Sequence, residues 1–357
     1  MIKRLEQLRR QMSQKGIPYL LITKPENRLY LSGFTGTTGV LLIGQETADF
    51  LADFRYVEQV KQQSPRFNVV KIEQGSAFGT ASEVLRKYKS EKLFFEEEHL
   101  TVKQYHELKE QLRDIGLAPG SGLVEELRMI KDEREISAIR RAMEIGDKAF
   151  AHILKYVKPG ISERELALEL EFFMRRQGAT GVAFETIMAS GLRSALPHGV
   201  ASDRQLQFGD LLTMDFGAVY QGYNSDMTRT VVLGEPDEKQ QEIYSIVLAA
   251  QLAGLAAVRE GVTAREVDEA ARQVITDRGY GEYFGHGTGH GVGLAIHERP
   301  RVAAKDETVL KAGMVVTVEP GIYLPGWGGV RIEDSVLVTG EGCEILTSSP
   351  KHELLKL

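Results

Sequence analysis

Four carboxylates and one histidine stand in short glycine-rich or strand-like phrases in the C-terminal part of the chain. In sequence order these potential metal ligands are Asp215, Asp226, His290, Glu319 and Glu333. Four carboxylates balance the charge of two divalent cations, and a set with one imidazole and no thiolate favours Mn, Co, Fe or Zn over Cu(I) or an iron–sulfur cluster. A water shared by two such cations ionises near neutral pH. The five residues therefore predict a two-metal centre of a hydrolase.

The first two aspartates lie in a segment that predicts a β-hairpin. Residues 211–233 are rich in Thr, Val, Tyr and Phe, and the Gln-Gly pair at 221–222 fits a short turn. With that turn Gly217 faces Asp226, and the period of two puts Asp215 on the face of Gly217. The two aspartates then occupy diagonal positions with Cα atoms about 7–8 Å apart, a spacing that favours a cation between the like charges. Two solvated aspartates beside a turn are the alternative that this pair alone leaves open.

Three histidines cluster among glycines in the stretch GHGTGHGVGLAIH at 285–297. Glycine at alternate positions disfavours a helix, so we expect a strand or loop whose backbone approaches a ligand closely. Further along, Glu319 and Glu333 interrupt two apolar strand patterns, where an acid without a partner is costly to bury. Bound metal removes that cost. The alternative, in which Glu319 merely ends a strand, leaves the acid at Glu333 unexplained.

The five ligands in their phrases resemble those of the metallopeptidase family with the pita-bread fold. The phrases are MDFGA, NSDMTR, HGTGHGVG, VEPGIY and VRIED, and the resemblance extends roughly over residues 127–357. That family includes methionine aminopeptidase, aminopeptidase P, prolidase and the non-metal enzyme creatinase. The resemblance implies that one metal is held by Asp215, that Asp226 and Glu333 bridge both metals, and that His290 and Glu319 complete the other.

The resemblance also implies that His198, His286 and His297 line the site. Histidine titrates near neutral pH, which suits proton transfer or a hydrogen bond to a tetrahedral intermediate. We therefore predict catalytic roles for His198 and His297, with Glu319 as a further proton shuttle. His286 is predicted to contact the substrate.

Three more side chains are predicted to bind substrate. Tyr323 and Arg331 flank the two glutamates, and Arg331 shares strand parity with Glu333, so both point to one face. Arg299, two residues beyond His297, could bind a substrate carboxylate. Simple packing of Tyr323 and solvation of Arg299 are the alternatives that the sequence leaves open.

The part of the chain before the ligands predicts a separate domain. Strand-like and helical patterns alternate from residue 2 to about residue 117, a loop follows at 118–122, and a charged helical stretch runs over 124–157. The phrases NRLYLSGFTG, DFRY and KDEREISAIRRA resemble the creatinase-like N-terminal domain and its junction, which methionine aminopeptidases generally lack. We therefore predict an α+β protein, with a creatinase-like α/β N-terminal domain at residues 1–123 and a pita-bread catalytic domain at residues 124–357.

The resemblance narrows the function to hydrolysis of the Xaa-Pro peptide bond. A bond to proline has no N–H and a restricted geometry, so general peptidases handle it poorly. Aminopeptidase P removes the first residue from longer peptides and prolidase splits Xaa-Pro dipeptides, and the sequence leaves both open. The expected nucleophile is a hydroxide that bridges two divalent ions, with Mn as the expected metal and Co, Zn or Fe as alternatives. The extra domain disfavours a methionine aminopeptidase, and the complete ligand set disfavours a non-catalytic peptide-binding scaffold.

Composition and charge exclude other classes of function. The net charge of −6 gives no basic footprint for nucleic acid, and no run of about 18 apolar residues predicts a membrane span. The charged start lacks the apolar region of a secretory signal, and the single cysteine, Cys343, fits a reducing compartment, so we expect a cytoplasmic protein. By resemblance, the expected partners are a proline-containing peptide substrate and a second copy of the chain in a homodimer.

Overall fold

The computed structural model describes residues 2–73, 75–120 and 122–357. The chain divides into two compact units, Met1–Arg128 and Met129–Leu357. The loop predicted at 118–122 includes Ser121, which lies outside the described residues. The division predicted at 123/124 falls at the start of helix α6 (Leu123–Met129).

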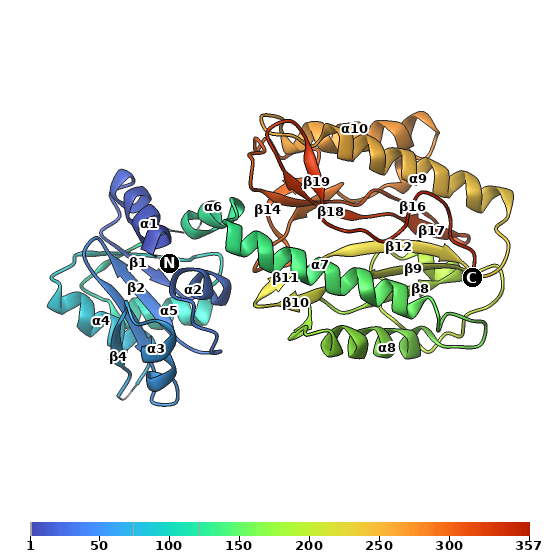
Figure 1. Ribbon diagram of the computed structural model, residues 1–357. Helices are drawn as coiled ribbons and strands as arrows, with labels where there is room; N and C mark the ends of the chain where they lie inside the picture. Colours follow the sequence, from blue (N-terminus) through green and yellow to red (C-terminus); the bar gives the residue numbers. More distant parts are fainter. Residues whose placement is uncertain (1, 74, 121) are drawn as a thin grey trace. The chain divides into compact units, whose positions relative to one another are not determined.

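The first unit is an α/β layer built on one six-stranded sheet (Figure 1). The strand order is β4-β3-β2-β1-β5-β6, and β1 pairs antiparallel with β2 and parallel with β5. Leu21, Leu42 and Leu93 of the strands pack in one core with apolar residues of α4 and α5. Besides α6, the elements are α1 (Ile2–Gln14), β1 (Tyr19–Ile22), α2 (Pro25–Ser32), β2 (Val40–Gly44), β3 (Ala48–Ala52), α3 (Val57–Gln63), β4 (Asn68–Lys71), α4 (Ala77–Lys87), β5 (Lys92–Phe95), α5 (Val102–Gln111) and β6 (Gly116–Pro119).

The second unit begins with a helix pair that packs on a three-stranded sheet of order β12-β9-β8. Phe150 of the first helix, Leu166 of the second and Met214 of the sheet share one core. Both helices start with a capping box, formed by Asp132 for α7 and by Ser162 for α8. The elements are α7 (Glu133–Ile153), α8 (Glu163–Arg176), β7 (Gly181–Val182), β8 (Ile187–Ser190), the 3-10 helix η1 (Gly191–Ala195), β9 (Leu211–Phe216), β10 (Ala218–Tyr220), β11 (Tyr223–Asn224) and β12 (Met227–Val232).

A second helix pair, α9 and α10, lies on the other side of the strands of this unit (Figure 1). These helices pack against a five-stranded sheet of order β14-β13-β15-β18-β19 through a core that includes Leu255, Val267 and Val316. The hairpin of β16 and β17 packs on α9 through Ile322 and Ile243. The elements are α9 (Glu238–Ala257), α10 (Ala264–Asp277), η2 (Gly281–Tyr283), β13 (Gly289–Gly291), β14 (Glu298–Val302), β15 (Val315–Val318), β16 (Gly321–Leu324), β17 (Gly328–Arg331), β18 (Asp334–Val338) and β19 (Cys343–Ile345).

The predicted hairpin forms with the predicted register. Tyr220 pairs with Tyr223, and further down the hairpin Asp215 pairs with Thr228. The turn residues have φ of 50° at Gln221 and 85° at Gly222, and positive φ at both positions is the geometry of a primed two-residue turn, whose twist matches that of the strands. The turn therefore sets the register that carries both aspartates.

The charged stretch that the sequence predicts as helical over 124–157 is two helices, α6 and α7, and not one. The side chain of Asp132 accepts hydrogen bonds from the backbone N–H groups of Arg134 and Glu135, at 3.0 Å each. The N–H of Lys131 donates to the carbonyl of Gly313. These bonds take the backbone at 130–132 out of a helix and start a new one at Glu133. The second helix ends at Ile153, short of the predicted end.

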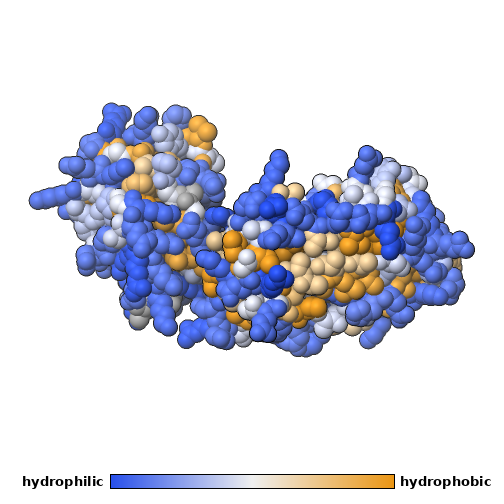
Figure 2. Space-filling view, turned by 90° about the horizontal axis from the view of Figure 1, so that it is seen from above, coloured by the Kyte–Doolittle hydropathy of each residue, from blue (hydrophilic) through white to orange (hydrophobic). Residues whose placement is uncertain are grey.

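One face of the second unit carries an apolar band, which Figure 2 shows on the side where α9 and α10 lie. Helix α9 has the sequence IYSIVLAAQLAGLAA over 243–257, and its Leu252 is exposed. Despite this composition, no helix within the described ranges is both long enough and apolar enough to cross a membrane.

Candidate metal centre

Three carboxylates converge from separate strands of the second unit. Asp215 lies in β9, Asp226 directly precedes β12, and Glu333 directly precedes β18. One oxygen from each lies within 4.8 Å of the oxygens of the other two, and all three side chains are buried. The register places Thr228 opposite Asp215, so Asp226 is on the diagonal that the sequence predicts.

His290 and Glu319 lie beside this cluster. The Nε2 of His290, in β13, is 3.2 Å from an oxygen of Glu319 and 3.5 Å from an oxygen of Asp226. Thr317 holds both residues, because its hydroxyl accepts from the backbone N–H of His290 and donates to Glu319 at 2.9 Å. The structure thus brings all five predicted ligands into one place.

Burial and mutual repulsion control the charge of the three converging carboxyl groups. Burial raises the pKa of Asp226 well above its usual value, and the charges of Glu333 and Asp215 raise it further. Burial, followed by the charges of Glu319 and Asp215, raises the pKa of Glu333 in the same way. Burial also raises the pKa of Asp215 and outweighs the nearby charge of Arg331. The positive charge near these three carboxyl groups is therefore too small to stabilise all of them in the ionised form.

Glu319 and His290 form an ion pair that behaves differently. Burial opposes the charge of Glu319, but the hydrogen bond and the charge of His290 outweigh it and lower the pKa of Glu319 to about 2. Burial likewise opposes the charge of His290, but the bond and charge of Glu319 raise the pKa of the imidazole. A histidine ligand must be neutral, so a bound cation would take the place of this proton.

The residues present fit divalent metal ions. Within the described part of the chain, the buried oxygens Asp215 Oδ1 and Glu333 Oε1 have no hydrogen-bond partner. Buried carboxylate oxygens without partners are costly, and bound cations remove both this cost and the repulsion between the carboxylates. Carboxylate oxygens with one imidazole are the donor set that Mn and its neighbours accept.

Arg331 holds one of the predicted ligands in position. Its guanidinium donates to Asp215 at 2.6 Å, to the hydroxyl of Tyr323 at 2.8 Å and to Thr228 at 3.1 Å. The side chain is 3% exposed. Each of the three guanidinium nitrogens donates to a protein group, and one of these bonds fixes Asp215. The substrate-binding role of Arg331 stays a prediction.

Tyr323 and His286 extend this support. The hydroxyl of Tyr323 is 2.9 Å from the Nε2 of His286, whose Nδ1 is 2.8 Å from the carbonyl of Gly287. Burial raises the pKa of Tyr323 to about 12, so the phenol stays neutral and can donate one hydrogen bond while it accepts another. Burial also lowers the pKa of His286. The chain Arg331–Tyr323–His286 therefore links two strands beside the ligands.

Of the other predicted site residues, His297 lies closest to a ligand. Its ring centroid is 4.3 Å from that of His290. Burial, followed by the charge of His290, lowers the pKa of His297, and His198 also contributes to this shift. His198 itself is exposed. Arg299 is an exposed residue of β14.

The glycines around His290 are needed for close contact between strands rather than for approach to a ligand. A Cβ on Gly289 would lie 2.0 Å from the carbonyl oxygen of Thr317, and one on Gly291 would lie 2.4 Å from that of Arg299. The predicted strand or loop is strand β13, which pairs with β14 and β15. The expected close approach is therefore present, but its partners are neighbouring backbones.

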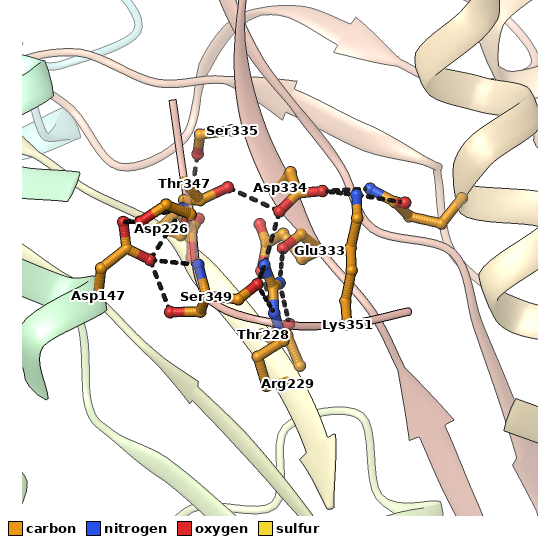
Figure 3. A network of polar contacts seen from close by, with 12 residues as sticks. Asp147, Asp226, Thr228, Arg229, Glu333, Asp334, Ser335, Thr347, Ser349 and Lys351 are labelled. Carbon is orange, nitrogen blue, oxygen red and sulfur yellow. Dashed lines mark hydrogen bonds and ion pairs between the residues drawn. The ribbon is translucent and has the colours of Figure 1, made fainter. Parts of the chain in front are cut away.

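A buried polar network that the sequence analysis missed surrounds Asp334, the first residue of β18, directly after Glu333 (Figure 3). Asp334 accepts from Arg229 at 2.8 Å, from Thr347 at 2.7 Å and from Lys351. Arg229 also donates to the carbonyl of Glu333. A signal was present, because an acid that follows Glu333 in an apolar strand needs its own partner.

Hydroxyl groups in the same region orient the ligands directly. Thr228 donates to Glu333 at 2.7 Å, and Ser335 donates to the backbone carbonyl of Asp226 at 2.9 Å. Both hydroxyls follow from the strand alternation, since Thr228 has the parity of Asp226 and Ser335 that of Glu333. Each hydroxyl group leaves carboxylate oxygens of the metal ligand that it contacts free for a cation.

Comparison with known proteins gives the class of the molecule. Residues 137–340 match the model of metallopeptidase family M24, and residues 4–130 match the Creatinase/Prolidase N-terminal domain. The chain belongs to metallopeptidase family M24. The predicted fold class, a pita-bread domain preceded by a creatinase-like domain, is confirmed, as is the prediction of a metallopeptidase.

Similar proteins cover the whole chain. A Xaa-Pro dipeptidase from Bacillus anthracis has a structure with a TM-score of 0.97 and 51% identity, over 100% of this chain and 99% of that one. The Xaa-Pro dipeptidase of Pyrococcus furiosus is 44% identical over 99% of this chain and 100% of its own length. An X-Pro aminopeptidase from Thermotoga maritima gives a TM-score of 0.88 and 40% identity, over 97% and 100% of the two chains. Family membership implies divalent metal ions and a peptide substrate.

Proposed function

We propose that the chain hydrolyses the Xaa-Pro peptide bond of dipeptides, with two divalent metal ions held by Asp215, Asp226, His290, Glu319 and Glu333. The observation that carries this proposal is the convergence of four carboxylates and one imidazole in a single buried centre. The names of the Bacillus anthracis and Pyrococcus furiosus relatives support the dipeptide substrate.

The metal ions supply Lewis acidity and lower the pKa of a water when bound. The overall reaction adds the water oxygen to the carbonyl carbon, breaks the C–N bond and leaves a proton on the proline nitrogen. Glu319 accepts and passes on a proton from the water. His198 and His297 donate hydrogen bonds to the oxygen that becomes negative, and burial lowers the pKa of His297, which favours its neutral form.

The surrounding groups fix the ligands and the substrate. Arg331 holds Asp215 in place, and Tyr323 and His286 bond to each other within the electrostatic field of Glu319. Arg299 is proposed as a cation for the substrate carboxylate, since it is exposed and lies two residues beyond His297, which directly precedes the same strand.

The metal and the oligomeric state are proposed from the donor set and from the family. Mn is the proposed metal, with Co, Zn or Fe able to occupy the same oxygen-rich ligands. A homodimer is proposed from the resemblance to family members with this N-terminal domain. The single cysteine, Cys343, fits a reducing compartment, and a cytoplasmic location stays a prediction.

A second candidate function is removal of the first residue from longer Xaa-Pro peptides. The similarity to the Thermotoga maritima X-Pro aminopeptidase favours it. The two functions differ only in whether the site tolerates a chain beyond proline, so they share every ligand.

Two matched peptides test the proposal. Manganese-loaded protein is given Ala-Pro and Ala-Pro-Ala at equal concentrations, with Ala-Ala as the control that lacks proline, and release of alanine is followed over time. We expect cleavage of Ala-Pro at least about 100-fold faster than of the tripeptide, because a site built for a free carboxylate rejects a substrate that leaves its cation unpaired. Equal cleavage of both would establish the aminopeptidase instead, and cleavage of Ala-Ala alone would contradict both functions.

A further inference from the structure

One buried carboxylate, that of Glu163, binds both ends of the loop that carries His198. At the start of the loop, the backbone N–H and the hydroxyl of Ser190 donate to it at 2.8 and 2.7 Å. At the end, the N–H and hydroxyl of Ser202 donate at 3.0 and 2.6 Å. Arg193, inside the loop, adds an ion pair at 3.0 Å. Glu163 is fully buried, and every one of these partners belongs to residues 190–202.

The loop is closed by further bonds of the same residues. Arg193 also donates to the carbonyl of Val200 at 2.6 Å, so the guanidinium spans the loop from one side to the other. Backbone bonds from Leu196 to Arg193 and from Gly199 to Leu196 form two consecutive turns, and His198 lies in the second. These hydrogen bonds cross-link the loop and hold its two ends together.

The loop is attached to strand β8, which pairs with the strand of a metal ligand, β9. Val200 bridges Ile187, and Ile187 pairs with Asp215 in the sheet. His198 is two residues from Val200. Ser194, in the middle of the loop, accepts at 2.8 Å from the N–H of Gly329, in the strand that ends at Arg331. The loop is therefore held by β8 and β17, two strands that contact β9, the strand of Asp215.

We propose that Glu163 is a positioning residue, which acts through His198 by fixing the loop 190–202 over the metal centre. The proposal rests on the proposed function, in which His198 stabilises charge on the reacting carbonyl oxygen. Among the described residues, the side-chain hydrogen bonds of Glu163 go to Ser190, Arg193 and Ser202 of the loop and to none of the five ligands. Displacement of a catalytic group by about 1 Å can cost about 100-fold in rate, so a clamp at both loop ends matters for turnover.

The alternative is that Glu163 merely starts helix α8, of which it is the first residue. Glu165 offers a matched control for that role. Its carboxylate accepts from the N–H and hydroxyl of Ser162 at 2.9 and 2.7 Å and forms the capping box of the same helix, without a contact to the loop. Glu165→Gln therefore changes the helix start by the same chemical step and leaves the loop clamped.

A double-mutant cycle tests the proposal with manganese-loaded protein and Ala-Pro as substrate. We expect Glu163→Gln to lower kcat/KM about tenfold, mainly through kcat, and His198→Ala to lower it about 100-fold. In the His198→Ala background, Glu163→Gln should lower kcat/KM by less than about a further twofold, because the side chain that Glu163 positions is absent. Glu165→Gln should leave kcat/KM within about twofold of wild type.

Two outcomes overturn the proposal: an undiminished effect of Glu163→Gln in the His198→Ala background, or no effect of Glu163→Gln in the wild type. Ser202→Ala, which removes one bond at the loop end, repeats the test if Glu163→Gln does not fold, with an expected loss of about threefold that also disappears without His198. Wild-type protein that fails to cleave Ala-Pro contradicts the proposed function itself, so the two failures are distinct.

Discussion

Replacing Asp226 by alanine is expected to lower kcat/KM for Ala-Pro by more than about 1000-fold, since the proposed bridge between two cations is lost together with their charge stabilisation. The oxygen of Asp226 lies within 4.8 Å of those of Asp215 and Glu333. Either neighbour would have to leave its own ligand position to replace the missing carboxylate. Bound manganese, measured by elemental analysis after dialysis, should fall below that of the wild type.

The same substitution should not destabilise the metal-free protein. Burial and the charges of Glu333 and Asp215 raise the pKa of Asp226, which means that its ionised form is disfavoured in the fold. Asp226→Ala removes that repulsion, and the thermal midpoint of metal-free protein should equal or exceed that of metal-free wild type. Asp203→Ala, at an exposed carboxylate, is the control for activity and metal content. Wild-type activity in Asp226→Ala with a full complement of metal would contradict the assignment of the metal centre.

Asp334→Ala is expected to cost about 3–5 kcal/mol of unfolding free energy, because it leaves Arg229 and Lys351 buried without their anion. Both cations are buried, and Gln251 also donates to Asp334 at 2.7 Å. The measurement is urea unfolding followed by the fluorescence of Trp327, the single tryptophan, which reports on the second unit. Asp147→Asn, at a half-buried acid that holds Ser348 and Ser349 in the same segment, should cost only about 1 kcal/mol.

The pH dependence of this effect has a definite sign. Burial opposes the charge of Asp334, but Arg229 and Lys351 outweigh it and lower the pKa of the carboxyl group. A carboxyl group with a lowered pKa in the folded state stabilises the fold above its unfolded pKa, near 4, and loses that contribution on acidification. The difference between wild type and Asp334→Asn should therefore be constant above about pH 5 and shrink below pH 4. A difference that grows as the pH falls would contradict the account of the network.

The sequence predicts those parts of the site that depend on local geometry. The turn at Gln221 and Gly222 determines the register of one hairpin, and strand alternation then places Asp215 and Asp226 on one diagonal. The same alternation puts Arg331 on the face of Glu333. These arguments need only neighbours along a strand, whose spacing is set by covalent geometry.

Other parts depend on partners that are far away in the chain. Asp334 and Arg229 are 105 residues apart, and Glu163 reaches Ser202 across 39. The local sequence around Glu163 shows only a helix start, so its burial and its clamp on the loop cannot be read there. The bonds of Arg331 to Asp215 and Thr228 were missed for the same reason, since parity gives its face but not the acceptors of its five N–H groups.

The most direct test of the two-metal account is a titration of metal-stripped protein with Mn²⁺, in which bound metal and the rate of Ala-Pro cleavage are measured on the same samples. The account predicts no cleavage without metal and saturation of both quantities at two Mn²⁺ per chain, with Asp226→Ala unable to reach either. Full cleavage by metal-free protein, or a rate that saturates with one bound ion and stays constant on the second, would contradict it.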